Sequence, residues 1–291
     1  MNLLISTHKG LYKIELKEDT ATLQQLSFGY YYGLGVWGDT ILAGRRIDPF
    51  SKESPTAFEL WDKEGNCLGT PDLDGNTILD VHQIAAGPRG YYICSTNKNI
   101  LEIYNHDFEH QSSLSFQDND IHGGILVNSV YVDGDHFWVS FQNAGSHSFA
   151  QHFCHIGSDF VFCNRNYLYA DGSHNIIHHN GWIYYNDSDA GCTQAVEEYG
   201  LDTEDWDLKG QIPAKQINLG DDKHTKGLAI HPASDRLICG VSEKGDLEHR
   251  FKSESHLILA ELSAMNPLTA YKLCTADGLN IGNINEIRIL D

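Results

Sequence analysis

Basic residues are scarce in this sequence of 291 residues. It has 20 Lys and Arg against 40 Asp and Glu, which gives a formal net charge of −20. No basic run is present that could neutralise the phosphates of a nucleic acid or the headgroups of an anionic membrane, so both are poor partners. The acidity is more typical of a protein kept in solution by its surface charge than of a site that recruits cations.

Paired cysteines and long hydrophobic runs are also absent. The seven cysteines form no CxxC pair, and most lie in apolar segments such as YYICST and RLICGV, where they are expected to pack as small core residues. The amino-terminal segment shows neither the basic region nor the A-x-A pattern of a signal peptide, and no apolar run approaches the roughly 20 residues that span a bilayer. We therefore expect a cytoplasmic protein.

Familiar catalytic and nucleotide-binding motifs do not occur. There is no GxSxG, HExxH, Walker loop or dinucleotide fingerprint, and DLDGN at 72–76 lacks the rest of a calcium loop. No nucleotide cofactor is expected. Helical periodicity is nearly absent too, because the one candidate helix, at 193–206, is interrupted by Gly200 and is more typical of a loop or a single turn. The chain is expected to be almost wholly β.

What the sequence does contain is a repeat of short strands. Six times a polar or aromatic residue opens an apolar strand that turns at Gly or Asn and is followed by a second strand ending in polar residues. We call the six opening residues the ring residues: Tyr32, His82, Asn128, His174, Lys226 and Asn285. They follow one another after 50, 46, 46, 52 and 59 residues, a spacing typical of four-stranded propeller blades.

The two ends of the chain indicate how such a ring closes. The segment GNINEIRILD at 282–291 supplies one strand, whereas NLLISTH, LYKIEL and ATLQQLSF near the amino end supply three strands without an inner partner. Joining them predicts a six-bladed β-propeller of four-stranded blades, with the N-terminal strands paired to the C-terminal strand. Closure removes exposed sheet edges that would otherwise invite aggregation. We predict a single domain over 1–291.

Three segments resemble the uncharacterised DUF4915-type propeller proteins. They are DVHQIAAGPRGYYICSTNKNILEIYN (80–105), SHNIIHHNGWIYYNDSDAG (173–191) and KGLAIHPASDRLICGVSE (226–243). The resemblance implies a propeller in a cytoplasmic setting and no settled activity. The chain is similar, more weakly, to gluconolactonase-like six-bladed propellers, which hold a divalent metal ion on the axis by acidic and amide side chains. Asn128 and Asn285 fit the amide roles, but His82 and His174 stand where oxygen ligands would be needed.

The chemistry is expected on one face of the ring. In a propeller, the loops that enter the inner strands and those that leave the second strands lie on the same face. The first set holds the ring residues, and the second set supplies further candidates for ligand binding: Arg46, Asn97, Asp187, Glu243 and Arg250. Tyr32, Asn128 and Asn285 are expected to bind the ligand with them, and the arginines can hold a carboxylate or phosphate by bidentate hydrogen bonds.

His82, His174 and Lys226 are the expected catalytic residues. A lysine that projects toward the axis beside His174 would have its pKa lowered by desolvation and like charge, toward the range of a base or a Schiff-base amine. The alternative is a lysine paired with Glu243 or Asp187. Those two carboxylates can also form a pair for acid/base work.

The 16 histidines raise the question of a metal ion on the axis. Its four ligands would be His82, His122, His174 and His224, since imidazole suits iron and zinc. The alternative is that these histidines bond the neighbouring backbone. Only two of the six ring residues are histidine, which weakens the four-histidine site.

The sequence leaves two alternative functions open. The first is a small-molecule-binding site at the axis, acting as a hydrolase or lyase by His/Lys acid/base chemistry with or without a metal. The second is a non-catalytic scaffold for a protein or peptide, with the aromatic run FGYYYG at 28–33 and insertions at 47–57 and 193–222 as the contact surface. Fold alone does not choose between them.

Overall fold

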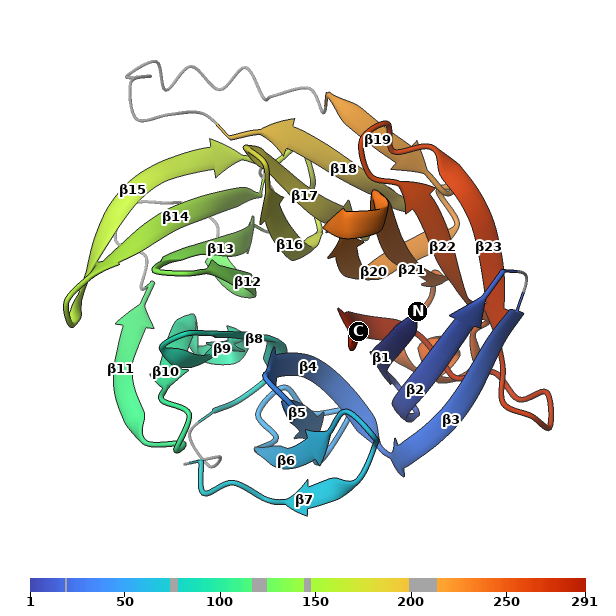
Figure 1. The fold of residues 1–291 in the computed structure, drawn as a ribbon, viewed down its shortest axis with the longest axis horizontal. Coiled ribbons are helices and arrows are strands. Elements are labelled where there is room, and N and C mark those ends of the chain that lie inside the picture. The colour runs from blue at the N-terminus through green and yellow to red at the C-terminus, as the bar shows by residue number, and fades with distance from the viewer. Residues whose placement is uncertain (19, 74–77, 117–124, 144–147, 199–213) are drawn as a thin grey trace.

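Six four-stranded antiparallel sheets surround a central axis (Figure 1). The structure is a computed structural model that describes residues 1–18, 20–73, 78–116, 125–143, 148–198 and 214–291. The predicted all-β, six-bladed propeller with four-stranded blades is confirmed.

In five of the six blades the strands run outward from the axis in chain order. The first two blades are β4 (Tyr30–Trp37), β5 (Thr40–Arg46), β6 (Thr56–Asp62) and β7 (Cys67–Gly69), then β8 (Val81–Gly87), β9 (Gly90–Ser95), β10 (Ile100–Tyr104) and β11 (His110–Ser115). The third and fourth are β12 (Ile125–Asp133), β13 (His136–Asn143), β14 (Phe149–Ile156) and β15 (Asp159–Tyr167), then β16 (Ser173–His179), β17 (Trp182–Asp187), β18 (Cys192–Glu197) and β19 (Lys215–Asn218). The fifth is β20 (Lys223–His231), β21 (Arg236–Glu243), β22 (Ser255–Glu261) and β23 (Pro267–Leu273).

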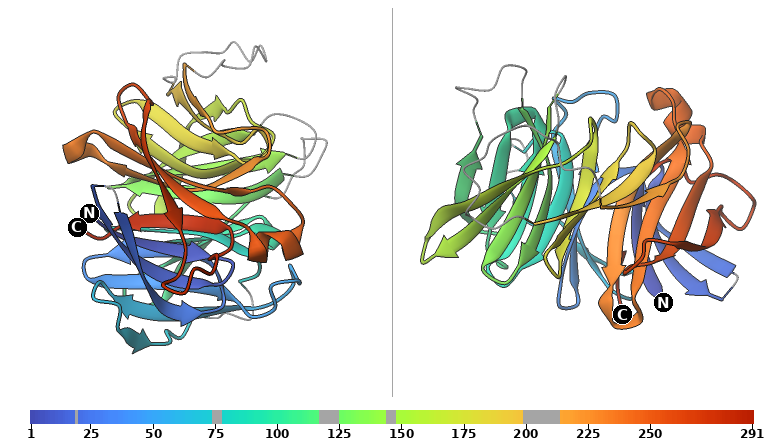
Figure 2. Two further views of the ribbon diagram at one scale, coloured as in Figure 1. Left: turned by 90° about the vertical axis from the view of Figure 1, so that its right-hand side faces the viewer. Right: turned by 90° about the horizontal axis from the view of Figure 1, so that it is seen from above.

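The sixth blade is assembled from both ends of the chain, as predicted. Its strands are β24 (Ile284–Ile289), β1 (Asn2–Thr7), β2 (Gly10–Lys17) and β3 (Thr20–Phe28), with β24 innermost. Beyond the ladder, Asn2 Nδ2 donates to the Asp291 carboxylate at 2.7 Å, and Leu290 N donates to Asn2 O at 2.9 Å. Figure 2 shows both termini on the same side of the ring.

Helical structure is confined to short segments in the described residues. They are α1 (Leu247–Lys252) and the 3-10 turns η1 (Thr96–Lys98) and η2 (Pro232–Ser234). None of these helices has the length and apolar character needed to cross a membrane. The candidate helix at 193–206 begins as β18, and its remainder from residue 199 lies outside the described residues. The supposed insertion at 193–222 therefore includes two regular blade strands, β18 and β19.

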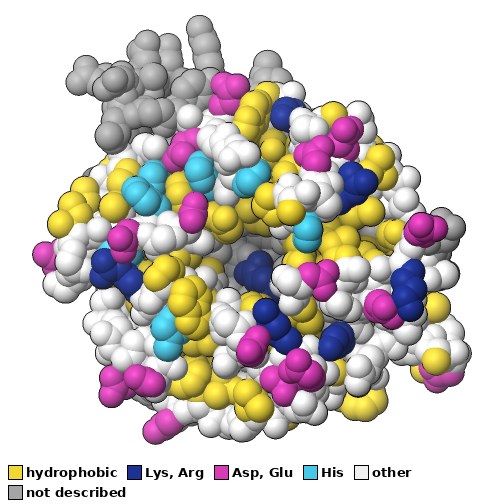
Figure 3. Space-filling model, viewed as in Figure 1, with side chains coloured by type: hydrophobic (Ala, Val, Ile, Leu, Met, Phe, Trp, Pro, Cys, Tyr) yellow, Lys and Arg dark blue, Asp and Glu magenta, His cyan; other side chains and the backbone are white. Residues whose placement is uncertain are grey.

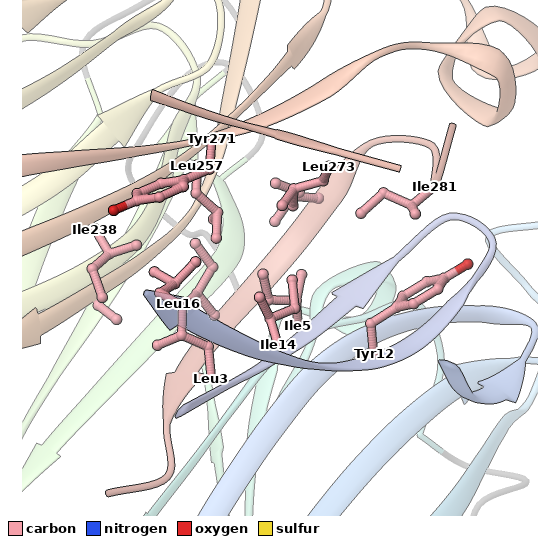
Figure 4. Packing of buried hydrophobic residues seen from close by; sticks show 13 residues of the cluster. Leu3, Ile5, Tyr12, Ile14, Leu16, Ile238, Leu257, Tyr271, Leu273 and Ile281 are labelled. Carbon is pink, nitrogen blue, oxygen red and sulfur yellow. The ribbon is translucent and has the colours of Figure 1, made fainter. Parts of the chain in front are cut away.

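The core lies between neighbouring blades. Figure 4 shows the contact between the fifth and sixth blades, where Leu3 and Ile5 of β1 and Ile14 of β2 pack against Leu257 of β22 and Leu273 of β23. Each of these side chains is fully buried, and burying one contributes roughly 1.5–3 kcal/mol to stability. This packing fixes the inner strands, and hence the ring residues, relative to one another.

A repeated irregularity marks the inner strands. In every blade the ladder between the inner strand and its neighbour shifts at the ring residue or directly after it. In the fifth blade, for example, Thr225 and Leu228 are paired but Lys226 and Gly227 between them are not. A β-bulge re-aims a side chain and increases the local twist. The six bulges thus set the direction of the ring residues, a feature that the sequence pattern did not predict.

Candidate functional site

The ring residues lie near the starts of the inner strands, and the two termini lie at the opposite ends of β24 and β1. We call the side with the ring residues the ring face and the other the terminal face. Figure 3 shows the terminal face, where the surface is hollowed at the centre and a Lys or Arg side chain lies in the hollow. The site described below is on the far side of that view.

Lys226 is the central cation of the ring face. Lys226 is only 4% exposed, and its Nζ lies 3.4 Å from the Tyr32 hydroxyl and 5.2 Å from the centre of the Tyr32 ring. In the part of the chain that the structure describes, no carboxylate lies within ion-pair distance of Nζ. Burial lowers the pKa of Lys226, and the positive charge of Arg250 adds to this against the opposing effect of Tyr32.

Tyr32 is enclosed by cations and an imidazole. Its ring stacks on that of His82 at 4.8 Å, and the guanidinium of Arg46 lies 5.0 Å from its centre. Burial by itself would raise the pKa of the phenol, but the charge of Lys226, followed by His82 and Arg46, outweighs it and lowers the pKa well below its ordinary value. The phenol is therefore prepared to ionise.

Three histidines follow Tyr32 in a series of neighbouring rings at the axis. The rings of His82 and His174 are stacked with centres 6.0 Å apart, and those of His174 and His224 are 6.4 Å apart. Burial, reinforced by Lys226, lowers the pKa of each imidazole, to about 3 for His82. His174 Nδ1 lies 2.7 Å from Asn128 Oδ1, whereas His82 Nδ1 and His224 Nδ1 are buried without a hydrogen-bond partner among the described residues. Neutral imidazoles with unused nitrogens thus line the axis.

The described residues do not fit a metal ion at this place. No group of three or more His, Cys, Asp or Glu side chains within the described ranges is arranged to hold one. The planes of His82 and His174 differ by only 16°, so the two rings face one another instead of directing nitrogens at a common point. His122, the fourth ligand of the predicted site, lies outside the described residues.

Arg46 joins the site through Asp80, which was not predicted. Arg46 Nη2 donates to Asp80 Oδ1, and His82 Nε2 lies 3.5 Å from the same oxygen. Both members of the ion pair are nearly fully buried. Asp80 therefore orients a guanidinium and an imidazole at once, with its own backbone in the left-handed region at φ 52°.

The other predicted rim residues have separate partners. Asp187 Oδ1 accepts hydrogen bonds from the backbone N–H groups of Asp189 and Ala190, and burial raises its pKa. The Glu243 side chain is 41% exposed and lies 3.4 Å from His249 in α1, and Asn97 is exposed in η1. No ion pair of Lys226 with Asp187 or Glu243 is present, because one carboxylate closes its own turn and the other faces α1.

Arg250 and Asn285 take mainly structural hydrogen bonds. Arg250 Nε donates to Gly245 O at 2.9 Å, while its charge lowers the pKa of the nearby His224. Asn285 Nδ2 donates to Tyr31 O at 2.7 Å, which joins the sixth blade to the first. Its Oδ1 is buried without a partner among the described residues and remains available.

A second polar layer follows directly behind the ring residues. Gln83 Nε2 donates to Glu286 Oε1 at 2.7 Å, Asn175 N donates to Ser129 Oγ at 2.8 Å, and Gly227 N donates to Asn175 Oδ1 at 2.8 Å. Each bond joins two different blades. Burial raises the pKa of Glu286 to about 7, although Arg288 at 2.9 Å opposes this. The layer forms a hydrogen-bonded polar floor beneath the site.

His8 and Tyr30 complete the site and were also missed. His8 Nε2 lies 2.9 Å from the Tyr30 hydroxyl, and Tyr30 lies under the Arg46 guanidinium at 5.2 Å. Their signals were present in the sequence. Tyr30 and Asp80 each precede a ring residue by two positions, Tyr30 within β4 and Asp80 directly before β8. His8 directly follows β1, as Arg46 ends β5, and both strands are second in their blades.

The alternative function, a scaffold for a protein or peptide, was predicted from an aromatic run expected to be exposed. The structure shows that most of this run is buried. In FGYYYG the three tyrosines at 30–32 are buried and only Phe28 is exposed. Tyr30 and Tyr32 point to the site, whereas Tyr31 packs in the core between the first and sixth blades. In the 47–57 segment Ile47 and Phe50 are exposed, and Phe50 stacks on Phe251 at 5.9 Å.

Solved structures similar to this chain share its fold at low sequence identity. A chain of the nidogen/laminin complex matches with a TM-score of 0.64 at 9% identity, covering 98% of this chain and 97% of that one. The periplasmic gluconolactonase of Pseudomonas aeruginosa matches with a TM-score of 0.57 at 10% identity over 99% and 98% of the two chains. A protein of unknown function from Bacteroides caccae gives 0.62 at 12% identity over 98% and 97%. No protein-family model and no curated protein sequence matches.

These similarities concern the fold. They include a gluconolactonase, which agrees with the weaker of the two resemblances in the sequence. The resemblance to the DUF4915 type has no matching family model behind it. At identities of 9 to 12%, the function has to be argued from the side chains.

Proposed function

We propose that the ring face binds an anionic small molecule on the axis, with Lys226 as its central cation. The observation that carries this is the burial of Lys226 without a carboxylate among the described residues. A buried charge costs several kcal/mol unless it is paired. Arg46 is paired with Asp80, which leaves the charges of Lys226 and Arg250. Ionisation of Tyr32 would compensate at most one of these two, so at least one positive charge is still to be met.

The acid/base chemistry of the site fits a hydrolase. The pKa of Lys226 is lowered and that of Tyr32 is lowered, so the two groups approach the range in which one can donate a proton while the other accepts it. Tyr32 would activate water as the base, and Lys226 would stabilise the developing negative charge. Neutral His82 and His174 would orient the ligand through their ring nitrogens. Since one fold neighbour is named a gluconolactonase, a lactone is the first substrate to test.

Calorimetric titration with gluconate and with inorganic phosphate tests the binding site. Lys226→Met should weaken binding of the preferred anion by about tenfold or more, the value of one charge-assisted hydrogen bond, and Lys226→Arg should retain part of it. Hydrolysis of gluconolactone is measured on the same variants.

The matched control is Lys215→Met. Lys215 lies over Trp182 and donates to Ser263 O at 2.6 Å, in the outer part of the fourth blade. Its replacement should leave anion binding unchanged. Equal affinity of wild type and Lys226→Met for both anions, or no binding by wild type, contradicts the proposal.

A further inference from the structure

Four side chains form a continuous line of hydrogen-bonding groups from the axis into the sixth blade. Lys226 Nζ lies 3.4 Å from the Tyr32 hydroxyl, which lies 3.4 Å from the Tyr30 hydroxyl. The Tyr30 hydroxyl is 2.9 Å from His8 Nε2, and His8 Nδ1 is 3.1 Å from the backbone oxygen of Asn283. All four side chains are buried. The line joins the fifth, first and sixth blades.

The backbone carbonyl at the end of this line fixes the tautomer of His8. A carbonyl oxygen only accepts, so Nδ1 must carry the hydrogen that it receives. In the neutral imidazole Nε2 is then the acceptor, and Tyr30 must donate its proton to it. Tyr30 has one hydroxyl proton but two neighbours that can accept it, His8 Nε2 and the oxygen of Tyr32. Tyr30 is therefore the branch point.

The charges around His8 keep it neutral. Burial lowers its pKa well below the ordinary value, and Lys226 of β20, Arg250 of α1 and Arg46 of β5 act in the same direction, against the hydrogen bond to Asn283. Among the described residues, the rings of Tyr30 and Tyr32 of β4 and of Phe251, at 5.4 Å, contact its ring. His224 of β20 is a further titratable group close enough to sense the charge of His8. At neutral pH the lone pair of Nε2 is available to accept a proton.

We propose that Tyr30 and His8 are a proton relay for Tyr32. The proposal rests on the proposed function, in which Tyr32 is the base. As the Tyr32 hydroxyl gives its proton to the oxygen of Tyr30, Tyr30 gives its own proton to His8 Nε2. The products are the Tyr32 phenolate, neutral Tyr30 and the His8 imidazolium, so each proton has moved one place and the total charge is unchanged. Lys226 and Tyr30 then both donate to the phenolate.

The relay responds to the ligand. The cations that disfavour the His8 imidazolium include Lys226 and Arg46, the groups that the proposed anion would meet. A bound anion compensates their charge and makes the imidazolium easier to form. Tyr32 would thus become a phenolate, ready to take a proton from water, when the ligand is in place.

Two measurements on the ligand-free protein test the relay. The ionisation of Tyr32 is followed by tyrosinate absorbance, isolated by subtracting the titration of Tyr32→Phe. Tyr30→Phe should raise the Tyr32 midpoint by about one pH unit, because the phenolate loses a donor. His8→Asn keeps a donor for Asn283 O but removes the Nε2 acceptor, which frees the Tyr30 proton for Tyr32 and should lower the midpoint. Nitrogen NMR of labelled histidine should show His8 protonated at Nδ1.

Tyr92→Phe is the matched control. The Tyr92 hydroxyl lies 2.6 Å from His155 Nε2, so this variant also deletes a buried Tyr–His hydrogen bond, in the second and third blades away from Lys226. It should leave the Tyr32 titration unchanged. Midpoints that do not move in either Tyr30→Phe or His8→Asn, or a His8 protonated at Nε2, overturn the relay. Because no anion is added, failure of the relay is distinguishable from failure of the anion site.

Discussion

At the scale of single residues, burial decides the protonation of the groups around the axis. His8, His82, His174 and His224 all have a pKa below that of an exposed histidine, with burial as the largest cause. Glu286 in the floor layer is shifted the other way, to about 7. Both shifts keep the group neutral, which is the expected consequence of removing water. The site can hold so many ionisable groups because few of them are charged at once.

These shifts predict how stability depends on pH. The pKa of His82 falls from about 6.5 in the unfolded chain to about 3 in the folded one. Its contribution is fully present above pH 6.5 and is lost as the pH falls toward 3, because the unfolded state then binds the proton more tightly. Glu286 has the opposite effect. Its contribution to the free energy of unfolding is present below about pH 4.5 and is lost as the pH rises through about 7. The four histidines outnumber it, so acid should destabilise the protein.

Urea unfolding at pH 6.5 and 4.5 measures this effect. In His82→Asn the loss of unfolding free energy between these two pH values should shrink by about 2 kcal/mol relative to wild type. An unaltered slope in His82→Asn would show that this imidazole is not desolvated as described.

At the scale of the elements, the bulges of the inner strands make room for the ring residues. In the fifth blade Gly240 of β21 lies opposite the unpaired pair Lys226 and Gly227. A Cβ atom on Gly240 would stand 2.1 Å from Lys226 O, a contact with backbone that cannot relax easily. Gly44 of β5 occupies the same position opposite Tyr32, but a Cβ there would meet side-chain methyl groups, with Ile84 Cδ1 nearest at 3.3 Å and those of Val81 and Thr56 at 3.4 and 3.5 Å.

Alanine at these two glycines should therefore have different effects. Gly240→Ala should lower the free energy of unfolding by about 1–3 kcal/mol and weaken anion binding, because the bulge that aims Lys226 must shift. Gly44→Ala, the matched control, should cost less than about 1 kcal/mol, since a flexible side-chain end can move away. Thermal or urea unfolding with gluconate titration checks both, and similar costs for the two variants would refute the role given to the bulge.

At the scale of the whole molecule, a protein with a net charge of −20 concentrates three cations around its axis. Closing the ring is what brings them together, because Arg46, Lys226 and Arg250 come from the first and fifth blades and the sixth lies between them. The pairing of β1 with β24, which closes the ring, also holds His8, Asn285 and Glu286 in place. Closure is thus a condition of the site as well as of stability.

Circular permutation changes where the chain begins and ends but keeps the ring closed, whereas truncation removes the strand that closes it. Comparing the two shows which of these properties the fold needs. A variant that joins Asp291 to Met1 by a short linker and opens the chain at the Gly134 turn should fold, because Asn2 and Asp291 are hydrogen-bonded and the turn is exposed. Deleting residues 284–291 should abolish cooperative unfolding and favour association, because the edge of β1 that pairs with β24 is then exposed. Melting curves and size-exclusion chromatography compare the two. A cooperative, monomeric truncated chain would contradict the importance of the seam.

Local pattern was sufficient for the fold. Alternation with period two, turns at Gly and Asn, and a spacing of about fifty residues correctly predicted six four-stranded blades and the pairing of the N-terminal strands with the C-terminal strand, since these signals depend on neighbours along the chain. The same pattern brought His82, His174 and Lys226 to one axis. It also left Tyr30, Asp80 and His8 unnoticed, although their positions relative to the ring residues were readable.

The sequence alone therefore determined the propeller, its closure and the identity of the residues that open the inner strands. Only the tertiary structure decided which of them meet and in what protonation state. Asp80 bonds Arg46 between the second and first blades, and His8 bonds Tyr30 between the sixth and first blades. Such contacts join residues far apart in the sequence, and the pKa shifts arise from burial that no local pattern encodes.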